Sequence, residues 1–303
     1  MTLSGRRSEQ RMDVKTIAVI GAGTMGRGIA YAAASGGYQT VLEDISSRVL
    51  EQATSWIGQS FEEGVSRGKV AAAVRDKALS LLSTATDVKD AIRDAELIIE
   101  AVPEELETKL ELFAILDKFA KIGAILASNT SSLSIAEFTG TIDSRDRCIG
   151  MHFFNPVPKM KLIELVRTPH TSEETVATCR EVARRMGKEV VLVNEAPGFI
   201  TTRVNALIGN EAFNMLQAGI ATAEDIDKAL KLGLHHPMGP FELVDLVGLD
   251  VRLNILEYLH RTLGEKYRPN ELLRQYVKEG RLGRKTGRGI YEYPLEKAAE
   301  KKA

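Results

Sequence analysis

Histidine is the natural base for a reaction that removes a proton near neutral pH, because its imidazole titrates in that range. The chain has five histidines, which are His152, His170, His235, His236 and His260. We expect His170 and His260 to be solvated bystanders. The adjacent pair His235 and His236 could suggest a metal site, but without nearby carboxylates or thiolates a loop is favoured. His152 is therefore the candidate base.

His152 lies in the apolar run Ile149–Phe154, where an unpaired imidazole would cost free energy. The next apolar run, Leu162–Val166, contains Glu164. A turn centred on Pro158 would join the two runs as a hairpin and place His152 opposite Glu164. The carboxylate would then fix the tautomer of the imidazole and stabilise the imidazolium that forms when it accepts a proton. A purely structural histidine–carboxylate pair is equally compatible with this spacing.

A glycine-rich turn follows the first apolar run, Lys15–Ile20, and opens a helix-compatible segment. Its spacing is Gly-x-Gly-x-x-Gly, at Gly21, Gly23 and Gly26. Asp44 closes the next apolar run. In this order the glycines permit a tight turn and a close approach of backbone N–H groups to a pyrophosphate, while Asp44 accepts hydrogen bonds from the adenosine ribose. A carboxylate there repels a 2′-phosphate, so NAD is favoured over NADP. FAD, or a turn that binds nothing, stays open by motif alone.

A cluster of hydroxyl residues, Ser128–Ser132, follows the apolar run Gly123–Ala127. In an open α/β sheet this position is the carboxyl edge, where ligands bind. The same cluster is also typical of a helix N-cap, and this alternative is favoured on the pattern alone. Arg67–Lys69 is either a phosphate contact or a solvated charged run.

The elements that position these residues change type along the chain. Up to Ala196, apolar strands alternate with helices, which favours a mostly parallel sheet with helices on both faces. The strands are expected at Lys15–Ile20, Tyr38–Leu42, Ala95–Glu100, Gly123–Ser128, Cys148–Phe154, Leu162–Val166 and Val190–Val193. Beyond Pro197, apolar residues recur at helical spacing. We predict an α/β, Rossmann-like domain over residues 15–196 followed by an all-α domain over 197–295.

Further elements are expected around this plan. A helix over residues 46–82 is broken around Ser66–Gly68, and another spans about 105–120. In the second domain, helices are expected at Leu243–Leu263 and Glu271–Glu279. Residues 1–14 are expected to form a disordered tail and 296–303 a charged tail.

Composition excludes several classes of function. The 40 lysine and arginine residues are balanced by 41 aspartates and glutamates, for a net charge of −1, so binding to nucleic acid or a membrane through charge is not expected. Cys148 and Cys179 lie in no CxxC pattern, which argues against a zinc site or disulfides. No apolar run reaches the roughly 18 residues of a membrane span, and the first residues lack the apolar core of a secretory signal. We expect a cytoplasmic protein with a small-molecule partner.

Several strings of the sequence resemble one family of oxidoreductases. They are GAGTMGRGIA, ASNTSSL, HFFNPVPKMKLIE, APGFI, MGPFELVDLVGLD and GRKTGRGIYEY, spread from about Lys15 to Tyr293. They are similar to strings of the L-3-hydroxyacyl-CoA dehydrogenase family, most closely of its short-chain branch, the 3-hydroxybutyryl-CoA dehydrogenases. HFFNPVP is the most diagnostic, since neither fold nor composition demands it. The resemblance implies a dinucleotide-binding domain followed by a helical domain that pairs two subunits into a homodimer.

The resemblance also implies roles for individual residues. By that comparison His152 is the catalytic base, Glu164 its orienting carboxylate and Ser131 the contact to the substrate oxygen. The residues implied around NAD are Gly21, Ala22, Gly23, Thr24, Met25, Gly26, Asp44, Glu104, Lys109, Ser131, Asn155 and Lys285. Ser60 and Arg67, together with Ser131, are implied to contact the acyl-CoA substrate, and no metal is implied.

One catalytic position departs from the family. Many members read GFIVNR, with an asparagine near the substrate carbonyl, whereas this chain reads GFITTR over residues 198–203 and has Thr202 in that place. A threonine hydroxyl can still donate a hydrogen bond, but it is shorter than an asparagine amide. Asn205 could compensate only if the helix begins early enough.

The implied reaction is hydride transfer between C3 of a 3-hydroxyacyl-CoA and NAD, as in the β-oxidation of fatty acids, with the C4 substrate preferred. One alternative keeps the chemistry and changes the substrate to a free hydroxy acid of the sugar-acid or carnitine type. A second is a β-hydroxyacid dehydrogenase with a catalytic lysine, against which the HFFNP string speaks. A third is a crystallin-like protein that binds the nucleotide and reduces nothing.

Overall fold

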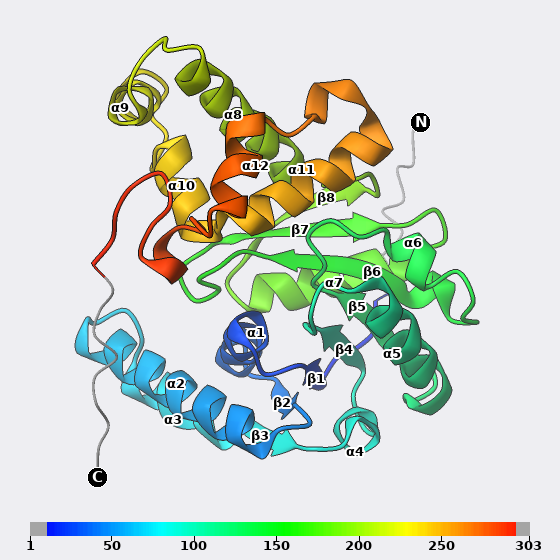
Figure 1. Ribbon diagram of the computed structural model, residues 1–303. Coiled ribbons are helices and arrows are strands. Elements are labelled where there is room, and N and C mark those ends of the chain that lie inside the picture. Colours follow the sequence, from blue (N-terminus) through cyan, green and yellow to red (C-terminus); the bar gives the residue numbers. More distant parts are fainter. Residues whose placement is uncertain (1–10, 295–303) are drawn as a thin grey trace, which may run out of the picture. The chain divides into compact units, whose positions relative to one another are not determined.

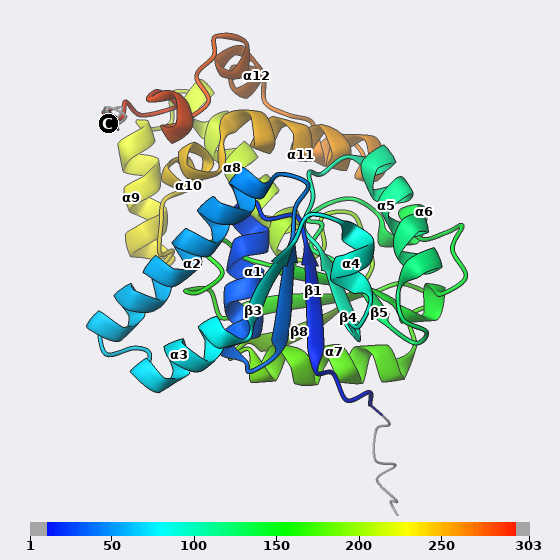
Figure 2. The ribbon, with the colours of Figure 1, turned by 90° about the horizontal axis from the view of Figure 1, so that it is seen from below.

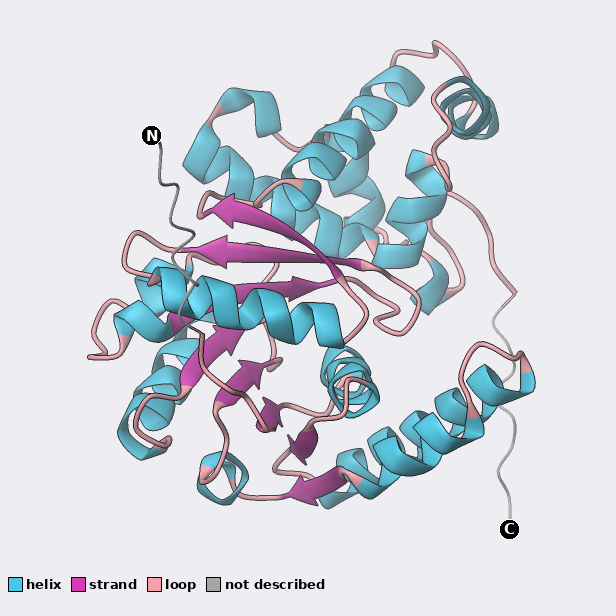
Figure 3. Cartoon of the chain, turned by 180° about the vertical axis from the view of Figure 1, so that it is seen from behind, coloured by secondary structure: helices cyan, strands magenta, loops and turns pink. Residues whose placement is uncertain are grey.

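The structure, a computed structural model, describes residues 11–294. The chain divides into two compact units, and the division falls between Ala196 and Pro197. The first unit combines a sheet with helices and the second is helical (Figure 3). The predicted fold class is therefore confirmed. Residues 1–10 of the predicted tail and the charged tail at 296–303 lie outside the described residues.

Within the described chain, the sheet of the first unit has eight strands in the order β3-β2-β1-β4-β5-β6-β7-β8 (Figure 1). Their bounds are β1 Thr16–Ile20, β2 Gln39–Glu43, β3 Leu82–Ala85, β4 Leu97–Glu100, β5 Ile125–Ser128, β6 Cys148–Phe153, β7 Leu162–Arg167 and β8 Glu189–Asn194. Neighbouring strands are parallel in every pair except β6 and β7, which are antiparallel. The carboxyl ends of β1, β4, β5 and β6 therefore lie at one edge of the sheet.

The expected strands are all present, and β3 is an additional one. It begins at Leu82, the last residue of the helix expected over residues 46–82. That region forms two helices, α2 (Ser47–Ser66) and α3 (Ala72–Ser80), separated near Gly68, where φ is +65°. The sequence LSTA of β3 gives little strand signal because it is short and lies at the edge of the sheet, with side chains that are exposed or half-buried.

Helices cover both faces of the sheet. On one face α1 (Thr24–Ser35), α2, α3 and α7 (Glu173–Arg185) contribute residues to a single apolar cluster with the strands. On the other face lie α4 (Val88–Ile92), α5 (Leu106–Phe119) and α6 (Ile135–Phe138), and Figure 2 shows them across the strands from α1 and α2. A short 3-10 helix, η1 (Arg145–Arg147), precedes β6.

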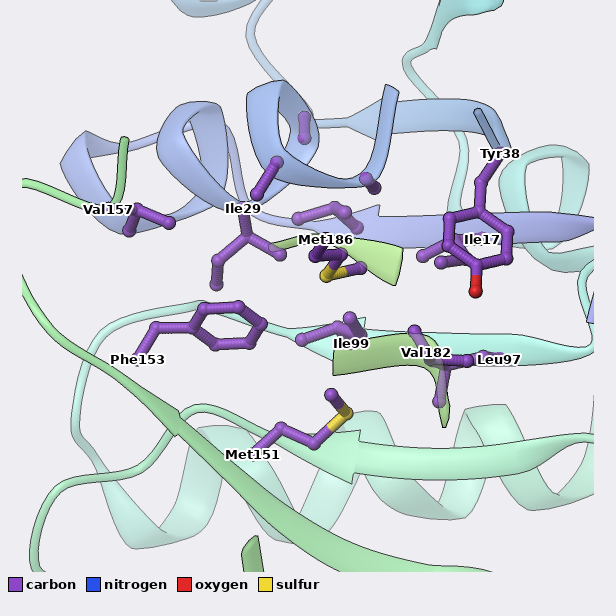
Figure 4. Packing of buried hydrophobic residues seen from close by; sticks show 14 of the residues in the cluster. Ile17, Ile29, Tyr38, Leu97, Ile99, Met151, Phe153, Val157, Val182 and Met186 are labelled. Carbon is purple, nitrogen blue, oxygen red and sulfur yellow. The ribbon is translucent and has the colours of Figure 1, made fainter. Parts of the chain in front are cut away.

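The apolar cluster on the first face holds α1 and α7 against the sheet. Ile29 of α1 and Met186, which directly follows α7, pack with Ile99 and Phe153 of the strands (Figure 4). All four are buried. Each fully buried apolar side chain of this size contributes about 1.5–3 kcal/mol to folding, so this face anchors the elements that carry the strand ends.

Residues 11–14 are packed, so the expected disordered tail over 1–14 is wrong for this segment. The backbone N–H of Met12 donates to Thr178 Oγ1 at 2.9 Å. Arg11 forms an ion pair with Glu181 of α7 at 3.4 Å. Val14 is 4% exposed and joins the apolar cluster. The apolar side chains of this segment dock it against the first unit before β1 begins.

The second unit contains five α-helices in its described part, with an apolar core between them. They are α8 Thr201–Gln217, α9 Ala223–Gly233, α10 Pro240–Val247, α11 Leu249–Leu263 and α12 Glu271–Lys278, with short 3-10 helices η2 Glu265–Tyr267 and η3 Arg284–Thr286. The single helix expected over Leu243–Leu263 is wrong. Gly248 adopts a φ of +109°, which favours glycine, and it separates α10 from α11.

Two buried aspartates tie the end of the described chain to this helical core. Asp227 accepts hydrogen bonds from the N–H of Phe241 and from the hydroxyl of Tyr291, both at 2.8 Å. Asp245 accepts from the N–H of Tyr291 at 2.9 Å and from the hydroxyl of Tyr293 at 3.0 Å. Among residues 11–294, no helix is both long and apolar enough to cross a lipid bilayer.

Candidate active site

The glycine turn has the shape that a dinucleotide requires. Gly21 adopts a φ of +94°, and a Cβ at Gly26 would lie 1.7 Å from the carbonyl oxygen of Gly21, so neither position accepts a side chain. A Cβ at Gly23 would meet nothing within 4 Å, so the space above this residue is open to a ligand. Gly23 is also the N-cap of α1 and brings no side-chain acceptor to the first-turn N–H groups. These N–H groups are suited to a pyrophosphate.

Asp44 lies directly after β2 and holds the same turn from the side. Its carboxylate accepts the N–H of Ala22 and the N–H of Ser46, each at 3.0 Å. Thr24 and Met25 form the first turn of α1, with Thr24 exposed. The structure therefore brings together the predicted residues of the pyrophosphate and adenosine side, and they fit NAD.

The predicted hairpin places His152 and Glu164 directly opposite each other in β6 and β7. His152 Nδ1 and Glu164 Oε2 are 2.8 Å apart, and the two residues are 6% and 1% exposed. The His152 ring also packs against Phe154, with 4.5 Å between the ring centres. His152 lies one residue before the carboxyl end of β6, so its imidazole is placed near the edge of the sheet where ligands bind.

Glu104 organises the turn that presents Ser131. Its Oε1 accepts from the hydroxyl of Thr130 at 2.6 Å and from the N–H of Ser131 at 2.9 Å, and its Oε2 is 3.2 Å from Lys109 Nζ. Burial alone would raise the pKa of Glu104, but the Lys109 ammonium and the hydrogen bonds from Thr130 and Ser131 hold it below the usual value. Glu104 is therefore a charged acceptor at the carboxyl edge, next to the predicted site residues Lys109 and Ser131.

Three further predicted residues of the first unit lie on its surface elements. Ser60 is half-buried on α2, and Arg67 follows the last residue of that helix and pairs with Glu63 at 2.6 Å. Both partners of this ion pair are exposed, which makes it weak and easily exchanged. Asn155 is exposed just after β6 and precedes Pro156 through a cis peptide bond.

Two predicted residues belong to the second unit. Thr202 is half-buried in the first turn of α8, which begins at Thr201, and Asn205 lies one turn further along the same helix. Lys285 lies in η3 and pairs with Asp250 at 2.6 Å.

The remaining histidines and cysteines differ from His152. His170 is exposed, and His260 pairs with the exposed Glu265 at 3.1 Å. His235 is exposed in the loop after α9. Within residues 11–294, no cluster of three metal-ligating side chains is present. Cys148 and Cys179 are buried thiols, and burial raises the pKa of each to about 12.

The sequence did not single out Glu100 as a site residue. Glu100 is the last residue of β4, is fully buried, and contacts both Lys109 and Ser128. The available signal was its position, because a carboxylate that ends an apolar strand lies at the same sheet edge as Asp44.

Comparison with known proteins gives a consistent assignment over both units. Residues 16–196 match the family model described as "3-hydroxyacyl-CoA dehydrogenase, NAD binding domain", and residues 198–293 match "3-hydroxyacyl-CoA dehydrogenase, C-terminal domain". A 3-hydroxybutyryl-CoA dehydrogenase of Bradyrhizobium diazoefficiens is 43% identical over 281 residues, covering 92% of this chain and 96% of the relative. The mitochondrial hydroxyacyl-coenzyme A dehydrogenase of Homo sapiens is 40% identical over 294 residues, covering 94% and 93%.

A solved structure agrees with this assignment. The crystal structure of (S)-3-hydroxybutyryl-CoA dehydrogenase from Ralstonia eutropha superimposes with a TM-score of 0.89 at 39% identity, covering 93% of this chain and 99% of that one. The chain belongs to the 3-hydroxyacyl-CoA dehydrogenase family of oxidoreductases, and its cofactor is NAD.

Proposed function

We propose that this chain interconverts (S)-3-hydroxybutyryl-CoA and acetoacetyl-CoA with NAD(H), with His152 as the general base and Glu164 as its orienting carboxylate. The observation that carries the proposal is the 2.8 Å contact between His152 Nδ1 and Glu164 Oε2 at the ligand-binding edge of the sheet. The names of the relatives from Bradyrhizobium diazoefficiens and Ralstonia eutropha support the C4 substrate.

The histidine–carboxylate pair suits a proton transfer that accompanies hydride transfer. Bound NAD would supply the hydride acceptor. Glu164 accepts the Nδ1–H of His152, which keeps the proton on that nitrogen and assigns proton removal from the 3-hydroxyl to Nε2. The same carboxylate stabilises the imidazolium that results, because the pair is shielded from water and their attraction is stronger there. In the reverse direction the imidazolium returns the proton to the ketone oxygen.

The hydroxyl of Ser131 is proposed to polarise the substrate oxygen. Ser131 lies on the turn that Glu104 holds through the N–H groups of Ser131 and Ser132. In the second unit, Thr202 is in the place where many family members have an asparagine, and its role as a hydrogen-bond donor to the substrate stays a prediction from the resemblance. Because its hydroxyl reaches less far than an amide, we expect Thr202→Asn to be active.

The CoA moiety is proposed to lie along α2, which carries Ser60 and is directly followed by Arg67. Arg67 can exchange its exposed partner Glu63 for a phosphate oxygen, since a guanidinium binds phosphate through several N–H groups. This contact would favour a CoA thioester over a free hydroxy acid.

The test is NADH oxidation with 3-ketoacyl-CoA substrates of increasing chain length and with the matching free acids. We expect acetoacetyl-CoA to give the highest kcat/KM, and Arg67→Ala to raise the KM for the thioester without changing that for NADH. Lys77→Ala, an exposed cation on α3, is the matched control. Faster turnover of a free acid would favour the hydroxy-acid alternative, and binding of NADH without any turnover would favour the crystallin-like one.

Three features of the resemblance stay predictions for this chain. They are a homodimer paired through residues 197–295, a cytoplasmic location, and a place in the β-oxidation of fatty acids. The molar mass in solution, measured by light scattering, tests the first of them. A monomer at micromolar concentration would contradict it.

A further inference from the structure

Glu100 is a fully buried carboxylate to which the proposed reaction assigns no role. It ends β4, and its Oε1 accepts from Lys109 Nζ at 2.7 Å and from the N–H of Val102 at 2.8 Å. Its Oε2 accepts the hydroxyl of Ser128, the last residue of the neighbouring strand β5. All three donors are therefore satisfied by one side chain at the carboxyl edge of the sheet.

These contacts close into a ring of five residues, which we call the carboxylate ring: Glu100, Lys109, Glu104, Thr130 and Ser128. Lys109 Nζ bridges the two carboxylates, at 2.7 Å from Glu100 and 3.2 Å from Glu104. Glu104 accepts the hydroxyl of Thr130 at 2.6 Å, and the N–H of Thr130 donates to Ser128 Oγ at 3.1 Å. Four members are at most 1% exposed, while the side chain of Glu104 is 35% exposed.

The ring fixes residues on both sides of the proposed proton transfer. Ser131 and Ser132 donate their N–H groups to Glu104. Asn129, which lies between two ring members, donates its N–H to the carbonyl of Glu100 and accepts the N–H of Phe153, each at 2.9 Å. Phe153 directly follows His152. Through these bonds the ring is linked both to the turn that carries Ser131 and to the strand that carries His152.

The position of the carboxylate ring in the sheet indicates which half of NAD would lie beside it. The strand order β2-β1-β4-β5 contains the switch point at which a dinucleotide lies across the strand ends. Asp44, after β2, marks the adenosine side, and the pyrophosphate belongs at the start of α1. The remaining nucleotide half therefore extends over β4 and β5, whose last residues are Glu100 and Ser128.

The geometry points to Glu100 as a positioning residue: by closing the carboxylate ring, it holds Lys109, Glu104 and the Ser131 turn in place for the nicotinamide half of NAD and for the substrate oxygen. Part of this inference, the role of Ser131, rests on the proposed function. The part that concerns NAD does not.

Glu100→Gln and Ser128→Ala each disrupt the bond between Ser128 and Glu100, and so each opens the carboxylate ring. In Glu100→Gln the amide cannot accept from both Lys109 and Ser128 with the strength of a carboxylate, and Ser128→Ala removes the hydroxyl while leaving every charge in place. We expect each to raise the Kd for NADH, measured by fluorescence, several-fold. We also expect kcat with acetoacetyl-CoA to fall roughly tenfold, because small displacements of positioned groups cost this much. The KM for acetoacetyl-CoA should change less than about twofold, since the proposed CoA contacts, Ser60 and Arg67, lie outside the ring.

The matched control is Asp117→Asn in α5. Asp117 likewise accepts bonds from a loop, through the N–H groups of Asp143 and Ser144 and the Ser144 hydroxyl, but it does so before β6, at the opposite edge of the sheet. We expect it to leave the Kd for NADH and kcat unchanged. We expect kcat of the double variant Glu100→Gln/Ser128→Ala to be only slightly lower than kcat of the less active single variant, because both substitutions act on the same bond.

Each outcome decides the inference. An unchanged Kd for NADH and an unchanged kcat in Ser128→Ala would overturn it, even if Glu100→Gln failed to fold. The inference would also be overturned if Asp117→Asn weakened NADH binding and kcat as much as the ring variants do. The same holds if the fold-loss of kcat in the double variant equalled the product of the two single losses, because either result indicates a general loss of structure. If wild-type protein did not reduce acetoacetyl-CoA, a raised Kd for NADH in both ring variants would still support the ring while the proposed function failed.

Discussion

The buried carboxylates Glu100 and Glu164 of the first unit have partners of a different kind from those of Asp227 and Asp245 in the second. In the first unit, Glu100 and Glu164 accept bonds from Lys109, Ser128 and His152, which are side chains that carry a charge or a mobile proton. In the second unit, Asp227 and Asp245 accept mostly from backbone N–H groups and from tyrosine hydroxyls.

Burial itself does not explain this difference. It raises the pKa of Glu100 and of Asp227 alike. The partners differ because the tasks differ: a carboxylate bonded to an imidazole or an ammonium determines where charge resides, whereas one bonded to N–H groups of distant segments joins those segments. We therefore expect the loss of Glu100 or Glu164 to reduce turnover and the loss of Asp227 or Asp245 to reduce stability.

His152→Gln should give the largest loss of activity. Without an imidazole to take the proton, kcat falls by about 10²–10⁴-fold, the usual contribution of a general base. NADH affinity should persist, because the residues that fit the pyrophosphate and adenosine lie in the turn after β1, at the start of α1 and after β2. Steady-state kinetics and NADH fluorescence measure the two quantities. Turnover close to that of wild type would contradict the assignment of the base.

Glu164→Gln should also lower kcat, by about 10²-fold or more, because a neutral amide stabilises an imidazolium less than a carboxylate does. The double variant His152→Gln/Glu164→Gln should be no slower than His152→Gln alone, since Glu164 acts only through the imidazole. If the fold-loss of kcat in the double variant equalled the product of the two single losses, Glu164 would have another role in turnover.

Asp245→Asn should reverse the pattern by reducing stability more than turnover. An amide cannot accept from the N–H groups of Ile290 and Tyr291 and the hydroxyl of Tyr293 together, so buried donors are left unsatisfied. We expect a loss of about 1–3 kcal/mol in the free energy of unfolding. Urea unfolding measures it, with the exposed Asp225→Asn as control. A strong loss of kcat in folded Asp245→Asn would contradict the expected difference between the buried carboxylates of the two units.

Glu43→Gln should have the smallest effect and should depend on pH. Glu43 is 4% exposed, and burial, together with the charge of Asp44, raises its pKa to about 7. A raised pKa means that the folded state favours the protonated carboxyl, so the contribution of Glu43 to stability is lost as the pH rises towards and past 7. The melting temperature of Glu43→Gln relative to wild type should therefore be higher at pH 8 than at pH 5. Parallel profiles would contradict the raised pKa.

The sequence predicted the parts of the site that depend on local spacing. The opposition of His152 and Glu164 follows from a hairpin with one turn, and the glycine spacing with Asp44 identifies the nucleotide turn. The carboxylate ring was not predictable in the same way. Glu100 and Ser128 are 28 residues apart on parallel strands joined through α5, and no single turn sets their register.

The errors in the fold have similar physical causes. Strand β3 is short and half-exposed, so its composition does not distinguish it from the end of a helix. At Gly248 the apolar helical pattern continues on both sides, while the backbone turns through a positive φ that no periodicity reveals. Residues 11–14 include only two apolar side chains, Met12 and Val14, and the segment is also held by Thr178 and Glu181 of α7, far along the chain.

The reversal of β7 affects the order in which the site can assemble. Because β6 and β7 are antiparallel, Glu164 near the start of one strand meets His152 near the end of the other at a sequence separation of only 12. Contacts of such short sequence separation cost little loop entropy and form early. Parallel strand pairs form later, because the connection between the two strands is longer and includes a crossover helix. We expect folding kinetics to show the β6–β7 hairpin protected from hydrogen exchange before the ends of β4 and β5, so that the proton-transfer pair exists before the carboxylate ring closes.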